Sequence, residues 1–387
     1  MDPERFRDST AGKPIRTSGG YWAFVPNPLP PELVWSDGMV SKLTEAERSL
    51  AALGEKGSDF ANPLTMVQPF IRREAVLSSR IEGTRADLDD LYRFQARPDP
   101  DRAGAGDELE VANYARALQY GIGRLNSLPV SLRLIREMHA RLFEGLSGRH
   151  ATPGEFRRSQ NWIGPPGSTL ENAPYVPPPV DDMHAGLDQL EKYLHAPSEL
   201  PGLIRIGLIH YQFEAIHPFL DGNGRIGRLL IALLLRHWGL LTHPWLYLSG
   251  YFDVHRQAYY DGLLGVSERG DWEGWLGLFL EAVARQSEEA GACLDRLEEL
   301  RAHYEQLLAN ERSAVGLMKV LIFLFGQPMA TVRRVERGIG ASHYKIAQRY
   351  VQRLVELGIL REITGGRRDR IYRADGIFDA IQGTLEL

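Results

Sequence analysis

The chain has 387 residues, of which 43% are hydrophobic and 25% charged, and this composition excludes a disordered, collagen-like or fibrous protein. The length predicts two or three domains, because one hydrophobic core seldom serves so many residues. The longest aliphatic run, residues 229–235, is far shorter than the ~20 residues of a membrane span, and the polar residues 1–14 lack the apolar segment of a secretory signal. With Cys293 as the only cysteine, no intrachain disulfide can form, so the sequence predicts a soluble, cytoplasmic protein without membrane contact.

The net charge of −5 is divided unevenly along the chain. Residues 311–387 hold 13 Lys and Arg against 8 Asp and Glu, a net charge of +5, which leaves −10 for the preceding 310 residues. This asymmetry predicts that residues 311–387 form a separate unit with a different kind of partner.

Turn residues cluster in the first forty positions, at Gly19-Gly20, Pro26-Asn27-Pro28 and Pro30-Pro31, and helix formers follow. We therefore expect an N-terminal arm over residues 1–60.

Apolar residues recur at helical spacing in the segments that follow. A helix over 69–82 is expected to end at Gly83, the residue type best suited to a left-handed C-cap. Further helices are expected over 108–125, 131–146, 182–194, 204–216 and 226–238. The predicted fold class is therefore mainly α, with a helical region at 61–107 and a helical core at 108–310.

Residues 153–180 interrupt the helical pattern. An extended stretch is broken by Gly164-Pro165-Pro166-Gly167, and Tyr175-Val176 leads into three prolines that cannot lie in a central strand. The segment predicts a small, exposed hairpin-like flap.

The most informative segment joins the last two predicted core helices. Residues 217–228 read His-Pro-Phe-Leu-Asp-Gly-Asn-Gly-Arg-Ile-Gly-Arg. Glycines at the start of the second helix leave backbone N–H groups open at a positive helix end, which predicts a phosphate cradle. The backbone groups expected to bind the cofactor are those of Gly222, Asn223, Gly224, Ile226 and Gly227.

Charged side chains in the same segment complete a nucleotide site. Arg225 and Arg228 oppose the helix dipole, which makes sense if an anion lies between them. Asp221 adds a hard oxygen ligand of the kind that holds Mg²⁺ beside phosphates, and His217 is placed to take a proton from a nucleophile. A lone Gly-Asn-Gly is usually only a turn, but all these groups within one loop and helix start indicate nucleotide chemistry.

At every defined position, residues 217–228 resemble the Fic family signature, HPFx(D/E)GNGRxxR. The resemblance implies an all-helical core that transfers AMP from ATP onto a Tyr, Thr or Ser hydroxyl of a target protein or of itself. It implies that His217 is the general base, that Asp221 binds Mg²⁺, and that Arg225 and Arg228 grip the β- and γ-phosphates. Homodimers are common in this family class, so a homodimer is expected too.

A second resemblance lies upstream, where Ser78-Ser79-Arg80-Ile81-Glu82-Gly83 fits the inhibitory motif of the same family, (S/T)xxxE(G/N). Ser78 and Glu82 share one helix face because they are four residues apart. The resemblance implies that Glu82 ion-pairs with Arg228 and blocks productive seating of the γ-phosphate. Alone, the motif is common on helices, where such a Glu is solvated or part of a cap.

Two further groups of residues acquire roles from the resemblance. The flap looks like the family's target-docking hairpin, whose main chain pairs with a substrate loop; the alternative is a surface loop with a packed tryptophan. Tyr251 and Tyr259 fall where the family builds its adenine pocket, although tyrosines at helical spacing are also typical of a core. His210 is interpreted as a core histidine. The flap residues are Trp162, Ile163, Gly164, Tyr175 and Val176.

Residues 311–387 resemble a winged helix-turn-helix. Three helices are expected over 314–326, 331–339 and 342–357, the last capped by Ser342, with a short basic hairpin over 360–363 and 370–372.

Basic residues gather on this unit in two places: Lys345, Arg349 and Arg353 on one helix face, and Arg367, Arg368 and Arg370 in the wing. Such a face suits DNA phosphates. The alternative is that these charges only solvate the face and that the wing mediates dimerisation or partner docking.

Two hypotheses of different class follow. One is a self-inhibited protein adenylyltransferase that uses ATP and Mg²⁺, whose site could also run backward and remove AMP. The other is a DNA-binding transcriptional regulator with a nucleotide-sensing Fic domain. The nucleotide donor could instead be UTP, GTP or CDP-choline, because the signature residues are expected to contact the phosphates and not the base.

Overall fold

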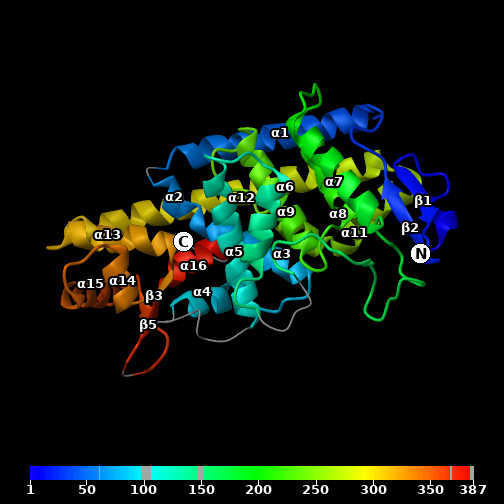
Figure 1. Cartoon of the computed structure of the whole chain (residues 1–387). Helices are drawn as coiled ribbons and strands as arrows, with labels where there is room; N and C mark the ends of the chain where they lie inside the picture. The colour runs from blue at the N-terminus through cyan, green and yellow to red at the C-terminus, as the bar shows by residue number, and fades with distance from the viewer. Residues whose placement is uncertain (61, 97–105, 147–151, 367, 384–387) are drawn as a thin grey trace.

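The computed structural model describes residues 1–60, 62–96, 106–146, 152–366 and 368–383, and the fold of these residues is mainly helical, as predicted (Figure 1). The first elements are η1 (Pro3–Phe6), β1 (Gly12–Arg16), β2 (Trp22–Pro26), α1 (Asp37–Ser58), α2 (Pro63–Met66), α3 (Gln68–Ile81) and α4 (Leu88–Ala96). The central elements are α5 (Asp107–Arg124), α6 (Leu132–Leu142), α7 (Val180–His195), α8 (Gly202–Ile216), α9 (Asn223–His237), α10 (Ser249–Val254), α11 (Arg256–Arg269) and α12 (Trp272–Leu308). The last elements are α13 (Ala314–Gly326), β3 (Met329–Thr331), α14 (Val332–Gly338), α15 (Tyr344–Glu356), β4 (Arg361–Glu362), β5 (Ile371–Arg373) and α16 (Asp375–Gln382).

The N-terminal arm is an ordered hairpin followed by a long helix. β1 and β2 pair antiparallel, with Gly12 opposite Pro26. The backbone N–H of Phe24 donates to the carbonyl of Val176 at 2.8 Å, so the hairpin is attached to the predicted flap segment. α1 then lies alongside α12, which crosses the molecule as its longest described helix (Figure 1).

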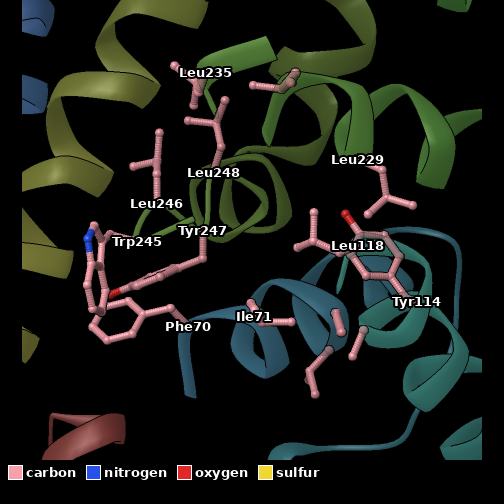
Figure 2. Packing of buried hydrophobic residues seen from close by; sticks show 14 of the residues in the cluster. Phe70, Ile71, Tyr114, Leu118, Leu229, Leu235, Trp245, Leu246, Tyr247 and Leu248 are labelled. Carbon is pink, nitrogen blue, oxygen red and sulfur yellow. The ribbon is translucent and has the colours of Figure 1, made fainter. Parts of the chain in front are cut away.

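The helix expected over 69–82 is present as α3, and Gly83 follows it with φ of +98°. Figure 2 shows Phe70 and Ile71 of α3 packed in the core, with Phe70 beside Trp245. These two rings meet edge to face with centroids 5.4 Å apart. Burial of this apolar face, rather than helix propensity alone, holds α3 in position.

α8 and α9 form the centre of the helical core and are joined by residues 217–222. The Trp275 indole N–H donates to the carbonyl of Gly207 at 2.9 Å and ties α8 to α12. α9 begins at Asn223, three residues earlier than the sequence predicts, because Gly222 takes a left-handed conformation and lets the helix start directly after it.

The C-terminal unit has the three predicted helices and the predicted β4–β5 hairpin, together with one strand that the sequence did not indicate. β3 joins the hairpin to give an antiparallel sheet in the order β3-β5-β4. The prediction that Ser342 caps the third helix is wrong, because His343 occupies the N-cap position and makes no capping hydrogen bond through its side chain. Arg367 lies outside the described residues.

α16 returns from the C-terminal unit to the body of the molecule, where it packs on α12 (Figure 1). The Arg296 guanidinium donates to the carbonyl of Ala380 at 3.0 Å. Cys293 is buried beneath α16, and burial raises the pKa of its thiol to about 11.

The C-terminal unit also contacts α3 directly. Arg72 donates to the carbonyl of Gly326 at 3.1 Å and to Gln327 Oε1 at 3.0 Å. The neighbouring Arg73 donates to the carbonyl of Ile381 at 2.9 Å. The helix that carries Ser78 is therefore bonded to residues some 250 to 310 positions later in the chain.

None of the helices in the described part of the chain combines the length and apolar character needed to cross a bilayer.

Candidate active site

His217 marks the end of α8 and adopts a left-handed conformation, with φ of +49°. A residue with a Cβ pays roughly 1–3 kcal/mol for this geometry, so neighbouring contacts must hold it. Two side chains do so: Arg157 Nε and Asn161 Nδ2 both donate to the His217 carbonyl, at 3.0 and 3.1 Å. Arg157 is itself fully buried, and burial lowers its pKa to about 10.

The imidazole of His217 is oriented as a proton acceptor. Its Nδ1 lies 3.2 Å from the Glu214 carbonyl, and because a carbonyl only accepts, Nδ1 carries the proton and Nε2 is the basic nitrogen. Burial lowers the pKa of His217 to about 4, so the ring is neutral at pH 7. The side chain is still 19% exposed, which leaves the ring accessible to a substrate.

Asn223 holds the loop between α8 and α9. Its Oδ1 accepts from the Phe219 N–H and its Nδ2 donates to the Phe219 carbonyl, both at 2.8 Å. Gly222 has φ of +82°, and a Cβ there would lie 2.8 Å from the Phe143 ring. This position therefore requires glycine for both its conformation and its space.

The N-terminus of α9 presents the predicted anion site. No side chain caps it in the described structure, so the first amides of the helix are directed toward the loop. Gly224 leaves room for the Glu82 carboxylate at this helix end, since a Cβ there would lie 2.4 Å from Glu82 Oε1. Ile226 differs from the prediction, because its N–H already donates to the Gly222 carbonyl and its side chain is buried. Gly227 lies deeper in the helix, where its carbonyl accepts from His210 Nδ1 at 3.1 Å.

Arg225 is buried and connects three elements. It donates to Asp221 Oδ1 at 3.1 Å and to Glu110 Oε2 of α5 at 3.4 Å. Its guanidinium also lies over the Phe143 ring, 5.2 Å from the centroid. No sequence pattern indicated Glu110, which lies 115 residues before Arg225.

The ion pair expected between Glu82 and Arg228 is present. Arg228 Nη2 lies 2.6 Å from Glu82 Oε1, while Nε donates to Ser78 Oγ at 2.8 Å. Burial lowers the pKa of Arg228, but the charge of Glu82, the hydrogen bond to Glu82 and the nearby Tyr259 and Tyr114 together outweigh it, and the net effect raises the pKa. Gly83 ends α3 directly after Glu82 and leaves its carboxylate free to reach α9.

His139 of α6 is a site residue that no sequence pattern marked. Its Nδ1 accepts from the Gly154 N–H at 2.9 Å, so Nε2 carries the proton and donates to the Asp221 carbonyl at 3.0 Å. The ring stacks on Phe219 with centroids 3.8 Å apart. His139 thus fixes the backbone that presents Asp221.

The flap is smaller than predicted. A single antiparallel bridge joins Ile163 and Tyr175. The Tyr175 hydroxyl donates to the Ala215 carbonyl at 2.9 Å, and Val176 is also buried, so these two side chains are packed inside the molecule, whereas the sequence predicted an exposed flap. Trp162 is 43% exposed and, with Gly164, lies on the accessible side of the bridge.

The two tyrosines expected at the adenine site lie in different surroundings. Tyr259 is 1% exposed, its ring stacks on Phe252 at 4.4 Å, and its hydroxyl bonds His210 Nε2 at 2.9 Å. It is therefore a core residue, which corrects the adenine-pocket prediction, and His210 is confirmed as a satisfied core histidine. Tyr251 lines a cavity of about 530 Å³ beside the face of α3 that carries Leu77, not the face that carries Ser78.

Within the described residues, no group of three or more His, Cys, Asp or Glu side chains could hold a metal ion. Asp221 offers one carboxylate, 41% exposed, beside the N-terminus of α9. Mg²⁺ typically takes one or two protein carboxylates and completes its shell with water and substrate phosphates. Asp221 fits a Mg²⁺ held jointly with a nucleotide, not one held by protein alone.

Comparison with known proteins matches this site to one family. Residues 40–123 match "Fic/DOC family N-terminal" and residues 129–235 match "Fic/DOC family". The protein adenylyltransferases Fic of Drosophila virilis and Drosophila willistoni are each 32% identical over 136 residues, or 34% of this chain and 25% and 24% of those proteins. The chain thus matches only about a quarter of the length of these curated relatives.

A solved structure shows the same fold. The crystal structure of a Fic family protein from Desulfovibrio desulfuricans G20 superposes with a TM-score of 0.55 at 18% identity, covering 89% of this chain and 98% of that one. The expected Fic-type helical core is confirmed.

Proposed function

We propose that this chain, which carries Fic/DOC family domains over residues 40–123 and 129–235, is a self-inhibited protein adenylyltransferase. The observation that carries the proposal is the convergence of a neutral imidazole and a blocked arginine on the N-terminus of α9. His217 lies in the loop that leads into this helix, and Arg228 lies in the second turn of the helix, where Glu82 holds it.

In the proposed reaction, a hydroxyl oxygen of a target protein forms a bond to the α-phosphorus of ATP. The bond from that phosphorus to the bridging oxygen of the β-phosphate breaks, pyrophosphate leaves, and the hydroxyl proton moves to His217 Nε2. Phosphoryl transfer needs mainly positioning and charge stabilisation. The amides at the start of α9 and the guanidinium of Arg228 would supply both, and a proton acceptor typically contributes about 10²–10⁴-fold.

Asp221 would hold Mg²⁺, and the metal would supply neutralisation of phosphate charge when bound. The chain's own residues prepare this position: the Asp221 carbonyl accepts from His139, and its carboxylate accepts from Arg225. The protein substrate would dock at the exposed Trp162 side of the flap bridge, where main-chain pairing can hold a loop beside His217.

Inhibition follows from competition for Arg228. A guanidinium that is bonded to Ser78 and to Glu82 cannot present the same N–H groups to a γ-phosphate. Displacement of Glu82 therefore frees Arg228 for ATP. The same Glu82, kept close to the site, could instead orient a water that removes AMP from a modified protein.

The test is intact mass spectrometry after incubation with ATP and Mg²⁺. Wild type should gain little AMP, Glu82→Gly should gain an AMP-sized adduct or label an added target, and Glu82→Gly with His217→Ala should gain none. Equal modification with and without His217 would rule out the proposed base. Parallel incubations with UTP, GTP and CDP-choline identify the donor.

A second candidate function, DNA binding by a winged-helix-like C-terminal unit, is favoured by exposed cations on that unit. Lys345 and Arg349 are exposed on α15, as are Arg368 and Arg370 beside the hairpin. Arg353 differs from these cations because it forms ion pairs with Glu311 at 2.7 Å and with Glu356 at 2.9 Å.

Gel shifts of the full chain on duplex DNA across a salt series test this function. Binding should weaken steeply with salt, and Lys345→Ala with Arg349→Ala should reduce it, whereas Arg353→Ala should change it less. Binding that ignores both salt and these substitutions argues against phosphate contact by α15.

A further inference from the structure

Glu214 lies beside His217 and belongs to neither family motif. It occupies the last turn of α8, three residues before His217, and its side chain is 11% exposed. Glu214 Oε2 lies 3.9 Å from His217 Nδ1, while the Glu214 carbonyl lies 3.2 Å from the same nitrogen. One residue thus presents both its backbone oxygen and its carboxyl group to the protonated side of the imidazole.

The other carboxyl oxygen of Glu214 is buried against the backbone of α9. Oε1 has no hydrogen-bond partner among the described residues. A Cβ at Gly227 would lie 2.2 Å from this oxygen, so only glycine leaves room for the carboxyl group. A buried carboxyl group with an unsatisfied oxygen is costly, and a nonpolar side chain would avoid that cost. The geometry therefore favours a chemical role over a packing role.

Charged groups from several elements act on this carboxyl group. Burial raises the pKa of Glu214 to about 8; Arg228 of α9 opposes that rise, and Glu82 adds to it. Tyr259 and Tyr260 of α11 also interact with Glu214.

The groups that act on His217 are partly the same. Burial lowers the pKa of His217 and the hydrogen bond to the Glu214 carbonyl raises it; the charge of Arg157 then lowers it, whereas Glu82 and Asp221 raise it. His210 borders the same edge of α9, with its ring 3.2 Å from the Cβ position of Gly227, and remains neutral because burial lowers its pKa to about 3.

We propose that Glu214 is a positioning residue for His217, and that the Glu82–Arg228 pair controls whether its carboxyl group is charged. The inference rests on the proposed function, in which His217 accepts the target's proton. Burial favours the protonated form of Glu214, and while Glu82 holds Arg228 its negative charge adds to this effect, so the imidazole has no anion at Nδ1. When Glu82 leaves, Glu214 ionises more readily beside Arg228.

The ionised carboxylate supports the proton transfer. His217 Nε2 takes the proton of the target hydroxyl, Nδ1 keeps its own proton on the Glu214 carbonyl, and the carboxylate lies next to the positive ring that results. Glu82 therefore restrains the site in two ways: it occupies the Arg228 guanidinium that would bind phosphate, and its charge disfavours ionisation of Glu214.

Histidine NMR of the full chain tests this without any need for turnover. The protein is labelled at histidine Cε1, and the His217 signal is identified by its loss in His217→Ala. In wild type, this signal should show an upper titration step near pH 8, from Glu214. The step should move to lower pH in Glu82→Gly and vanish in Glu214→Gln. The matched control Glu199→Gln, at an exposed position, should keep it. Persistence of the step in Glu214→Gln overturns the inference.

Activity supplies the second readout, in the Glu82→Gly background. Glu214→Gln should lower AMP transfer by about tenfold or more and should flatten the acid limb of the pH–rate profile. Glu214→Asp keeps the charge and should retain a weaker limb, which excludes simple misfolding. Transfer with an unchanged pH profile overturns the inference and leaves the proposed function standing. If the NMR titration step behaves as expected but no AMP transfer occurs in any variant, the coupling of Glu214 to His217 stands and the proposed function fails.

Discussion

Glu82 and Arg228 lie 146 residues apart in the chain and form an ion pair of 2.6 Å on α9. Arg228 is buried, whereas the Glu82 side chain is 35% exposed, so the carboxylate can withdraw toward solvent and the guanidinium cannot. The movable partner of this pair is therefore Glu82, and regulation should act on the segment that carries it.

Removal of the Ser78 hydroxyl should weaken this restraint. Ser78 Oγ accepts from Arg228 Nε at 2.8 Å, and a hydrogen bond to a charged group contributes about 1.5–3 kcal/mol. We expect Ser78→Ala to raise basal AMP transfer several-fold, to a level between wild type and Glu82→Gly, as measured with α-labelled ATP.

The neighbouring Ser79 is a matched control for that substitution. It is also buried, but its hydroxyl has no hydrogen-bond partner among the described residues. Ser79→Ala should leave transfer unchanged. Equal effects of the two substitutions on transfer would mean that the position of the Arg228 guanidinium does not depend on the Ser78 hydroxyl.

Gly222→Ala should damage the anion site. The substitution forces a Cβ into a left-handed conformation and to within 2.8 Å of the Phe143 ring. We expect a loss of about 1–3 kcal/mol in the free energy of unfolding and a drop in nucleotide affinity by calorimetry. Gly239→Ala, where φ is +73° with open space around the Cβ position, separates conformational strain from the clash. Intact nucleotide binding in Gly222→Ala would contradict the assigned cradle.

Arg72→Ala tests whether the C-terminal unit holds α3. The substitution leaves the Gly326 carbonyl and Gln327 Oε1 without their donor, which should lower the free energy of unfolding by about 2–4 kcal/mol. Because α3 loses an anchor, basal transfer should rise above wild type. Arg48→Ala, an exposed arginine of α1, is the control. Lower stability with unchanged transfer would show that Glu82 keeps its position without this anchor.

His210 should make the fold sensitive to acid. Burial lowers its pKa from the ordinary 6.5 to about 3, so the unfolded chain binds more protons than the folded chain between these values. The stabilisation is complete above pH 6.5 and is lost as the pH falls below it, by up to about 1.4 kcal/mol per pH unit.

Urea unfolding at pH 7.5 and pH 5 measures this contribution. His210→Gln should be less stable than wild type at pH 7.5, because Gly227 and Tyr259 lose a matched partner. Its free energy of unfolding should, however, fall less than that of wild type between pH 7.5 and pH 5. His303→Gln, at an exposed position, should follow wild type. An unchanged slope in His210→Gln would assign the acid sensitivity to other groups.

The sequence predicted the parts of the site that are local. The loop of residues 217–222 owes part of its shape to Gly222 and to Asn223, which follows the loop, and most helices follow the apolar spacing closely. Glu110 and His139 were missed because they reach the site through tertiary packing from α5 and α6. A single buried carboxylate or imidazole belongs to no motif and no regular spacing, so the sequence alone does not mark it.

The errors have equally specific causes. Tyr175 and Val176 precede three prolines and therefore read as exposed, but the buried Arg157 donates to the Pro178 carbonyl at 2.5 Å and holds the segment inside. Tyr259 has the spacing of a core residue and is one. β3 is three residues long and exists only because β5 pairs with it.

The bonds from α3 to Gly326 and Ile381 have a consequence for newly made protein. The ribosome delivers α3 and the loop of His217 well before it delivers α13 and α16. A nascent chain that has folded through α9 holds both the loop of His217 and Glu82, but it does not yet contain the carbonyls that anchor α3. We therefore expect each molecule to pass through a period during its synthesis when the restraint on Arg228 is weaker than in the finished protein.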